Sequence, residues 1–141
     1  MPTIQGRTRK QLRQSIGYNL GAIFTGTATG GSTSTLVDTS LTTVIGGADD
    51  HIGKWIKFTS DNANNETVVR VTDSSTTTLT FQPTLASLAV ANTHEYELWD
   101  MDYNPDTVNE FINQAITYAT GHVYDPVEKL DLHSDGKQLR F

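Results

Sequence analysis

The sequence lacks several of the residues and motifs on which common protein chemistries depend. Its 141 residues include no cysteine, so it can form neither disulfides nor thiolate metal sites, which fits a chain made in a reducing compartment. No apolar run approaches the roughly 18 residues that a membrane-spanning helix needs. Gly-x-Ser-x-Gly and Ser-x-x-Lys nucleophile motifs and a phosphate-binding loop ending in Gly-Lys-Ser/Thr are all missing. A membrane role and the commonest enzyme classes therefore have no support.

The few groupings of titratable residues are poor candidates for a site. Asp49, Asp50 and His51 offer two carboxylates and an imidazole to a cation, but consecutive residues rarely converge on one ion, and a solvated polar loop is the better interpretation. Asp100 and Asp102 share one face of a strand end without an enclosing pocket for acid–base chemistry. We therefore expect no catalytic residue, no metal and no cofactor, and predict that the chain is not an enzyme.

What the sequence does contain is a run of short alternating segments between residues 53 and 99. Four segments place pairs of apolar side chains on one face, namely Ile56 with Phe58, Val69 with Val71, Leu79 with Phe81, and Tyr96 with Leu98. Such alternation, with polar residues between, is typical of a sheet with one face in water. Turn-forming residues at 61–65 and 73–75 separate the segments. The stretch predicts a meander of at least four strands, most simply closed or folded into a small barrel.

Two tryptophans do not follow this alternation. A stacking platform for single-stranded nucleic acid or sugars would interleave aromatic rings with lysine and arginine, but here few basic residues accompany the rings, so core packing explains most of them better. Trp55 and Trp99 are out of phase with the inward residues of their strands. We expect each to contact either a partner or a covering helix.

The segment before the strands has the spacing of a short amphipathic helix. Thr8 is a plausible N-cap, and apolar residues recur at helical spacing at Leu12, Ile16, Leu20 and Ile23. Two glycines interrupt it, Gly17 and Gly21, which either weaken the helix or mark close packing. A Thr-, Ser- and Gly-rich stretch follows, in which we predict a strand at 33–38 after a Gly30-Gly31 turn.

A second helix is predicted after the strands. Asn104 provides a cap, Pro105 fits the first helical position, and an apolar stripe recurs at three-and-four spacing up to Thr120, where Gly121 ends the helix. Tyr124-Asp125-Pro126 is predicted as a turn. In the tail from residue 130 onwards, apolar residues alternate as in an unpaired strand edge. Leu139 and Phe141 are expected to be covered by a partner or by a chain that continues past residue 141.

These segments predict a mainly β protein with flanking helices, in which a small antiparallel β-barrel or sandwich carries a basic N-terminal helix and a C-terminal amphipathic helix. The predicted units are a basic arm or helix at 1–24, the β-module at 25–103, and a helix with a terminal strand or tail at 104–141.

Charge is distributed unevenly along the chain. Four basic residues lie within the first 13 positions, whereas the remaining 128 residues hold 6 basic and 16 acidic side chains, a net charge of −10. These four are Arg7, Arg9, Lys10 and Arg13. Such asymmetry suits head-to-tail packing of copies or docking to two different neighbours, and a solvated helix and strand face are the alternative. We favour a basic face that contacts an acidic protein surface, such as residues 100–110 of an adjacent subunit, over DNA, which four charges would bind only weakly.

The order of these motifs resembles modules in structural proteins of tailed bacteriophages. The resemblance rests on the Thr-rich lead-in at 34–39, the strand Gly53-Lys54-Trp55-Ile56-Lys57-Phe58, the strands at 69–72 and 79–85, and the helix that Asn104-Pro105-Asp106 begins. It implies a virion component at the head–tail neck, tail or fibre attachment, built into a symmetric oligomer, and it carries over no catalytic residue.

The expected function is therefore that of a structural virion protein, assembled in the host cytoplasm, that joins neighbouring components or anchors an appendage. Its partners would be portal, neck, tail or fibre proteins and copies of itself, with at most weak contact to DNA and none to a membrane. The alternative is a carbohydrate- or receptor-binding module at a tail tip, for which Trp55 or Trp99 would be the ligand-contacting residues.

Overall fold

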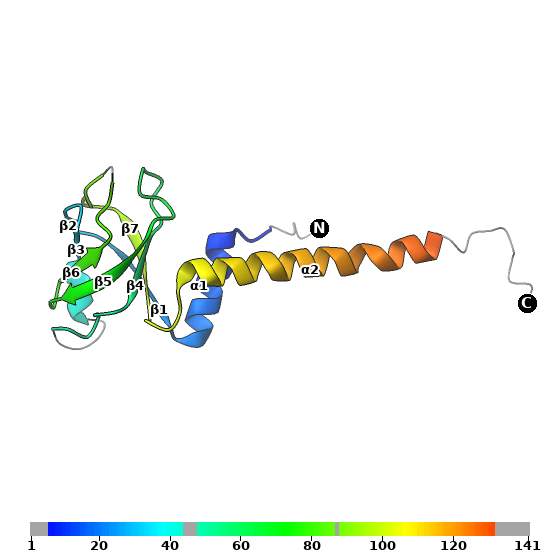
Figure 1. Cartoon of the computed structure of the whole chain (residues 1–141), viewed down its shortest axis with the longest axis horizontal. Helices are drawn as coiled ribbons and strands as arrows, with labels where there is room; N and C mark the ends of the chain where they lie inside the picture. The colour runs from blue at the N-terminus through cyan, green and yellow to red at the C-terminus, as the bar shows by residue number, and fades with distance from the viewer. Residues whose placement is uncertain (1–5, 44–47, 87, 132–141) are drawn as a thin grey trace, which may run out of the picture.

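The structure is a computed structural model that describes residues 6–43, 48–86 and 88–131. Within these residues the chain forms a seven-stranded antiparallel sheet flanked by two helices (Figure 1). The elements in chain order are α1 (Arg9–Leu20), β1 (Ile23–Thr27), β2 (Gly30–Gly31), β3 (Thr35–Val37), the 3-10 helix η1 (Thr39–Thr43), β4 (Trp55–Phe58), β5 (Val68–Ser74), β6 (Thr78–Gln82), β7 (Glu95–Trp99) and α2 (Pro105–Asp131). The predicted fold class, a mainly β module with a helix on each side in sequence, is confirmed.

The sheet curls around its core but is not closed into a barrel. Its strand order is β1-β7-β4-β5-β6-β3-β2, which leaves β1 and β2 at the two edges. These two strands are successive parts of one bent segment, in which Ala28 donates its N–H to His94 O and Thr29 donates to Val37 O. The first half of the segment, β1, pairs with β7, and the second half, β2, pairs with β3, so the two edge strands do not pair with each other. The closed barrel is therefore the part of the prediction that was wrong.

Glycines take part in pairing at this edge. The predicted Gly30-Gly31 turn is instead strand β2, which pairs with Val37 and Leu36 of β3. The turn itself comes one step later, where Ser32 N–H donates to Thr35 O. The position of Gly31 requires a glycine, because its φ is 148° and a Cβ there would lie 2.3 Å from Thr35 O.

The interior of the curled sheet is the main hydrophobic core. All four predicted inward pairs lie in it, each residue 3% exposed or less, together with Leu36, Leu41, Leu85 and Val90. Phe58 and Phe81 meet edge to face there, with ring centroids 5.8 Å apart. The period-two alternation therefore identified this face correctly.

The outer face of β4 and β7 is not exposed to water, contrary to the expectation of one wet face. Helices α1 and α2 cover it, and a second cluster of buried residues, Trp99, Val108 and Ile112, packs with the partly buried Leu12, Ile23 and Trp55. Trp99 is fully buried, so its covering-helix alternative is the one that the structure realises. Lys57 and Glu97, charged residues that a wet face would expose, are buried beneath the same helices.

Helix α1 has the predicted cap and a different end. Thr8 and Gln11 form a reciprocal capping box, and Gly21 ends the helix with a left-handed φ of 65°. Ile23, predicted as the last residue of the helical stripe, belongs to β1 instead. Gly17 marks close packing, because a Cβ there would lie 2.7 Å from Cη2 of Trp99 and 2.9 Å from Cβ of Ile23.

Helix α2 is longer than predicted and extends away from the sheet (Figure 1). It passes through Gly121, the expected end, and through Tyr124-Asp125-Pro126, the expected turn. An interior glycine costs about 1 kcal/mol relative to alanine, which is a penalty but not a stop, and Gly121 lacks the left-handed conformation that ends α1. Neither α1 nor α2 combines the length and the apolar character that crossing a membrane would require.

Candidate functional site: the two-helix face

A buried ion pair joins the first helix to the last strand of the sheet. Arg13 of α1 is fully buried and forms a two-pronged contact with Glu97 of β7, through Nε at 2.8 Å and Nη2 at 3.0 Å. Its third contact is a 2.9 Å hydrogen bond from Nη1 to the Asn109 side chain of α2. A planar guanidinium matches a carboxylate in this way and leaves few donors unsatisfied. One residue therefore ties together α1, β7 and α2.

The carboxylate of Glu97 is equally well satisfied. Besides the two bonds from Arg13, it accepts hydrogen bonds from Gln14 Nε2 at 3.0 Å and from the indole N–H of Trp99 at 2.9 Å. A buried carboxylate needs such partners because an unpaired one loses its hydration without compensation. Arg13 and Glu97 therefore find their hydrogen-bond partners within the chain, under the two helices.

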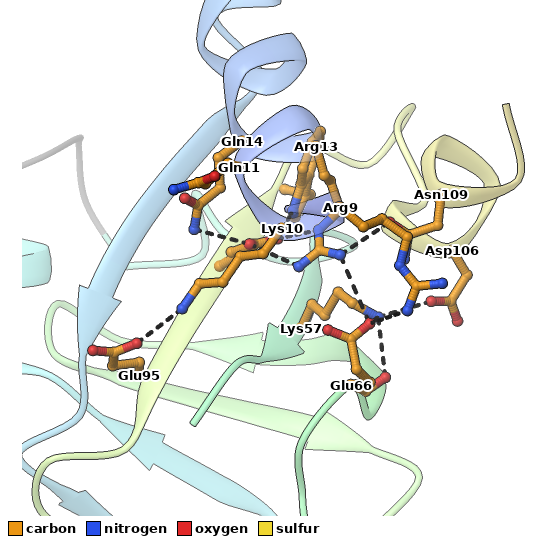
Figure 2. Close-up of polar contacts among 12 residues, drawn as sticks. Arg9, Lys10, Gln11, Arg13, Gln14, Lys57, Glu66, Glu95, Asp106 and Asn109 are labelled. Atoms are coloured by element: carbon orange, nitrogen blue, oxygen red, sulfur yellow. Dashed lines mark hydrogen bonds and ion pairs between the residues drawn. The ribbon is translucent and has the colours of Figure 1, made fainter. Parts of the chain in front are cut away.

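A second buried cation lies next to it. Lys57 of β4, 1% exposed at its side chain, places Nζ 3.0 Å from Asp106 of α2 and 3.0 Å from Glu66 (Figure 2). Partial burial acts to raise the pKa of Glu66, but the hydrogen bond and charge of Lys57 and the charges of Arg13 and Arg9 lower it overall. The cations of this cluster therefore favour the ionised form of Glu66.

The basic N-terminal segment finds acidic partners within its own chain. Lys10 pairs with Glu95 at 3.0 Å, and Arg9 lies 3.8 Å from Glu66, both at the surface. The predicted basic face offered to a neighbouring molecule does not hold for Arg13, because burial against Glu97 removes its guanidinium from the surface. Arg7 and Arg9 remain exposed. The uneven charge distribution could have predicted that α1 pairs with β7, since the helix is basic and the strand contains Glu95 and Glu97.

The two tryptophans are held by intramolecular contacts. Trp99 lies under Gly17 and donates its indole N–H to the Glu97 carboxylate. Trp55 is partly buried, donates its indole N–H to Met101 O at 3.1 Å, and has the Arg70 guanidinium 5.3 Å from its ring centroid. Trp99 therefore has no ring face open to a ligand. At Trp55, a ligand would have to share the ring with Arg70.

His51 differs from the solvated loop residue that the sequence predicts. His51 is 2% exposed and its backbone N–H donates a hydrogen bond to Ser74 Oγ. Its ring Nδ1 has no hydrogen-bond partner. Burial and then the charge of Lys54 lower the pKa of His51, against an opposing effect of Asp50. Among the described residues, no three His, Asp or Glu side chains gather closely enough to hold a metal ion.

An apolar groove lies between α1 and α2, beside the buried charges of Arg13 and Glu97. The groove of about 520 Å³ is lined by Leu12, Ser15, Ile16, Phe111, Ile112, Ala115, Ile116 and Ala119. Large apolar side chains around it are exposed, namely Ile16 (38%), Leu20 (52%), Phe111 (63%), Ile116 (49%) and Tyr118 (68%). We call these residues and the groove lining the apolar helix face. The sequence identified the apolar stripe on α2. It did not indicate that α2 extends beyond the sheet, so that most of the stripe is uncovered.

The remaining predicted site residues, Leu139 and Phe141, lie outside the described residues. Comparison of the chain with protein-family models, with curated proteins and with solved structures finds no match.

Proposed function

We propose that this chain is a structural protein that works by assembling with other chains, and specifically a virion component of a tailed bacteriophage that joins or anchors parts at the head–tail neck or tail. The observation that carries the proposal is the apolar helix face. A soluble protein seldom exposes a contiguous patch of large apolar side chains unless another surface covers it. Here part of that patch lies on α2, which leaves the body of the module, as expected of a connector.

The polar chemistry of the helix face supports an architectural role. The side chains of Arg13 and Glu97 are fully buried and are bonded to one another within the chain. Such a cluster fixes the angle at which α2 leaves the sheet, which is what a joint between components requires. The order of strands and helix that resembles tail and neck modules supports placing this role in a virion.

The test is whether the chain is present in purified particles and requires the apolar helix face to be there. Mass spectrometry of particles from the virus whose genome encodes this chain should detect it at a fixed copy number. Phe111→Asp should reduce that copy number at least tenfold, whereas Thr117→Asp, at a position on the opposite side of α2, should not. Particles that are infectious and contain no copy of the chain would contradict the proposal.

A glycan- or receptor-binding role at a tail tip is the alternative, and no particular contact favours it. Trp99 is covered by α1, and the ring of Trp55 already contacts Arg70. Binding to a glycan array that Trp55→Ala abolishes would favour this alternative over the proposed one.

A further inference from the structure

We propose that the segment 48–53 is a proton-operated latch, which opens when His51 takes up a proton and then uncovers one end of the hydrophobic core. The inference goes beyond the proposed function and does not depend on it. The segment leads into β4, and its single buried residue is His51, which is 2% exposed. The other residues of the segment are exposed or half-buried. One titratable side chain therefore anchors the segment.

Backbone hydrogen bonds tie this latch to one strand of the sheet. The N–H of Asp49 donates to Ser74 O at 3.1 Å, and that of His51 donates to Ser74 Oγ at 3.3 Å. The N–H of Gly53 donates to Val71 O at 2.9 Å. All three acceptors belong to β5, beyond its residues 68–70, which pair with β4. The latch can therefore open locally while β4 and β5 keep their register.

The ring of His51 lies where a proton is costly. Its Nδ1 is buried and has no hydrogen-bond partner among the described residues. An imidazolium carries an N–H on both nitrogens, so a proton taken up in place would leave a charged donor unpaired in the interior. Turning the ring out to water removes this cost. The geometry of the ring therefore couples uptake of the proton to opening of the latch.

The charged groups around His51 do not compensate for a proton on its ring. Burial lowers the pKa of His51 most, Lys54 lowers it further, and Asp50 opposes both effects. After β7, Asp100 lines the same cavity as His51, but its carboxylate is paired with Lys54 at 3.2 Å. Arg70 of β5 adds a positive charge at the end of the latch, where its Nε lies 3.4 Å from a backbone carbonyl oxygen. The closed latch thus disfavours the proton that the open latch accepts.

A cavity beside His51 indicates what the latch covers. The cavity has a volume of about 140 Å³, and its apolar walls include Ala22, Phe24 and Leu98. Ala22 and Leu98 are each 3% exposed, and Leu98 belongs to the main hydrophobic core. Because His51 lines the same cavity, its departure widens a space that already exists. Opening of the latch therefore exposes the end of the core between β1 and β7.

Hydrogen exchange of the full chain, followed by NMR, tests the latch at single amides. From pH 7.5 to pH 5.5, a histidine with an ordinary pKa of about 6.5 makes opening about tenfold more favourable. The protection of the Gly53 amide, relative to an unstructured chain at the same pH, should therefore fall about tenfold. In His51→Asn it should not change. The Phe58 amide, which donates to Thr67 O, should exchange at least tenfold more slowly than Gly53 at pH 5.5, because it requires a larger opening.

An NMR titration of the His51 ring in the wild type provides a second measurement that needs no variant. The ring should take up its proton below pH 6.5, at the pH where Gly53 loses its protection. A ring that is protonated while Gly53 stays protected would overturn the latch. An equal fall in His51→Asn would also overturn it, as would equal exchange of Gly53 and Phe58, since the segment would then open only with the whole chain. None of these outcomes bears on incorporation into particles, so the latch and the proposed function can fail separately.

Discussion

At the scale of single residues, Arg13 has an unusual position, because it is a fully buried cation that three elements depend on. Its donors are used by Glu97 and Asn109, and Glu97 is in turn satisfied by Gln14 and Trp99. Removing one member of a buried pair leaves the other buried and uncompensated, which is far more costly than breaking a pair at the surface.

Arg13→Met should therefore lower the free energy of unfolding by about 3–5 kcal/mol, since it leaves the Glu97 carboxylate without its main partner. Lys10→Met, which breaks the surface pair with Glu95, should cost about 1 kcal/mol or less. Urea titrations followed by circular dichroism measure both values. The double variant Arg13→Met with Glu97→Leu should recover much of the loss. Equal effects of the two single variants would contradict the assignment.

His51 should make the protein less stable in mildly acidic solution. Its pKa is lowered in the folded state by burial and by Lys54, so the unfolded chain takes up a proton first as the pH falls below about 6.5. The free energy of unfolding should therefore fall between pH 7 and pH 5. His51→Asn, which cannot titrate, should flatten this part of the profile in urea titrations at each pH. An unchanged slope in the variant would show that other groups cause it.

At the scale of elements, the helices contribute unequally along their length. The first turns of α2 pack on Trp99 through Val108 and Ile112, whereas Phe111 on the same stripe points away from the sheet. Similarly, α1 leaves no room for a side chain at Gly17, where a Cβ would lie 2.7 Å from Trp99. Substitutions one or a few positions apart should therefore have very different effects.

Ile112→Ala should cost about 2–5 kcal/mol in the free energy of unfolding, because it opens a cavity beside Trp99. In the separated single chain, Phe111→Ala should cost much less, since its ring is 63% exposed and loses little packing. Chemical denaturation at low protein concentration compares the two. A large cost for Phe111→Ala under these conditions would mean that its ring is covered within the chain.

The two helical glycines provide a matched pair. Gly17→Ala should destabilise the fold although alanine favours helices, because the new Cβ would lie 2.7 Å from Trp99. Gly121→Ala meets nothing within 4 Å and should raise the helix content, with a gain of up to about 1 kcal/mol. Thermal melts followed at 222 nm measure both. Stabilisation by both changes would contradict the close packing of α1 on β7.

These elements also indicate how far the sequence could predict the structure. The inward pairs from Ile56 to Leu98 were predictable because alternation reports directly on one buried face. The burial of Lys57 and Glu97 was not, because charged residues at outward positions normally face water, and only long-range pairing with α1 and α2 reverses this. The candidate site was predicted in its parts, as a basic segment, an apolar stripe and two out-of-phase tryptophans, but not in its arrangement.

At the scale of the whole molecule, the sheet and its covering helices form one connected unit. The ion pairs of the buried Arg13 and Lys57 link α1 and α2 to β4 and β7, while the main core lies on the far side of the same strands. Loss of either layer exposes the other.

Unfolding of the monomer should therefore be a single cooperative transition. Helical signal at 222 nm and tryptophan fluorescence, which reports on Trp55 and Trp99, should change at the same denaturant concentration. A low protein concentration keeps the chains apart for this measurement. Helical signal from α1 and α2 lost wholly before the fluorescence change would show that the helices are an independent unit.

The composition of the covering layer has a consequence for synthesis on the ribosome. Arg13 emerges 84 residues before Glu97 and 96 residues before Asn109, so the partners of the first helix are made near the end of the described chain. A 12-residue helix is too short to persist alone, and α1 must remain unformed or loosely held while the strands are translated. The outer face of β4 and β7 is completed only when the start of α2 arrives. Until α2 has left the ribosome, Lys57 lacks Asp106 and Arg13 lacks Asn109, so these charged side chains stay open to chaperones.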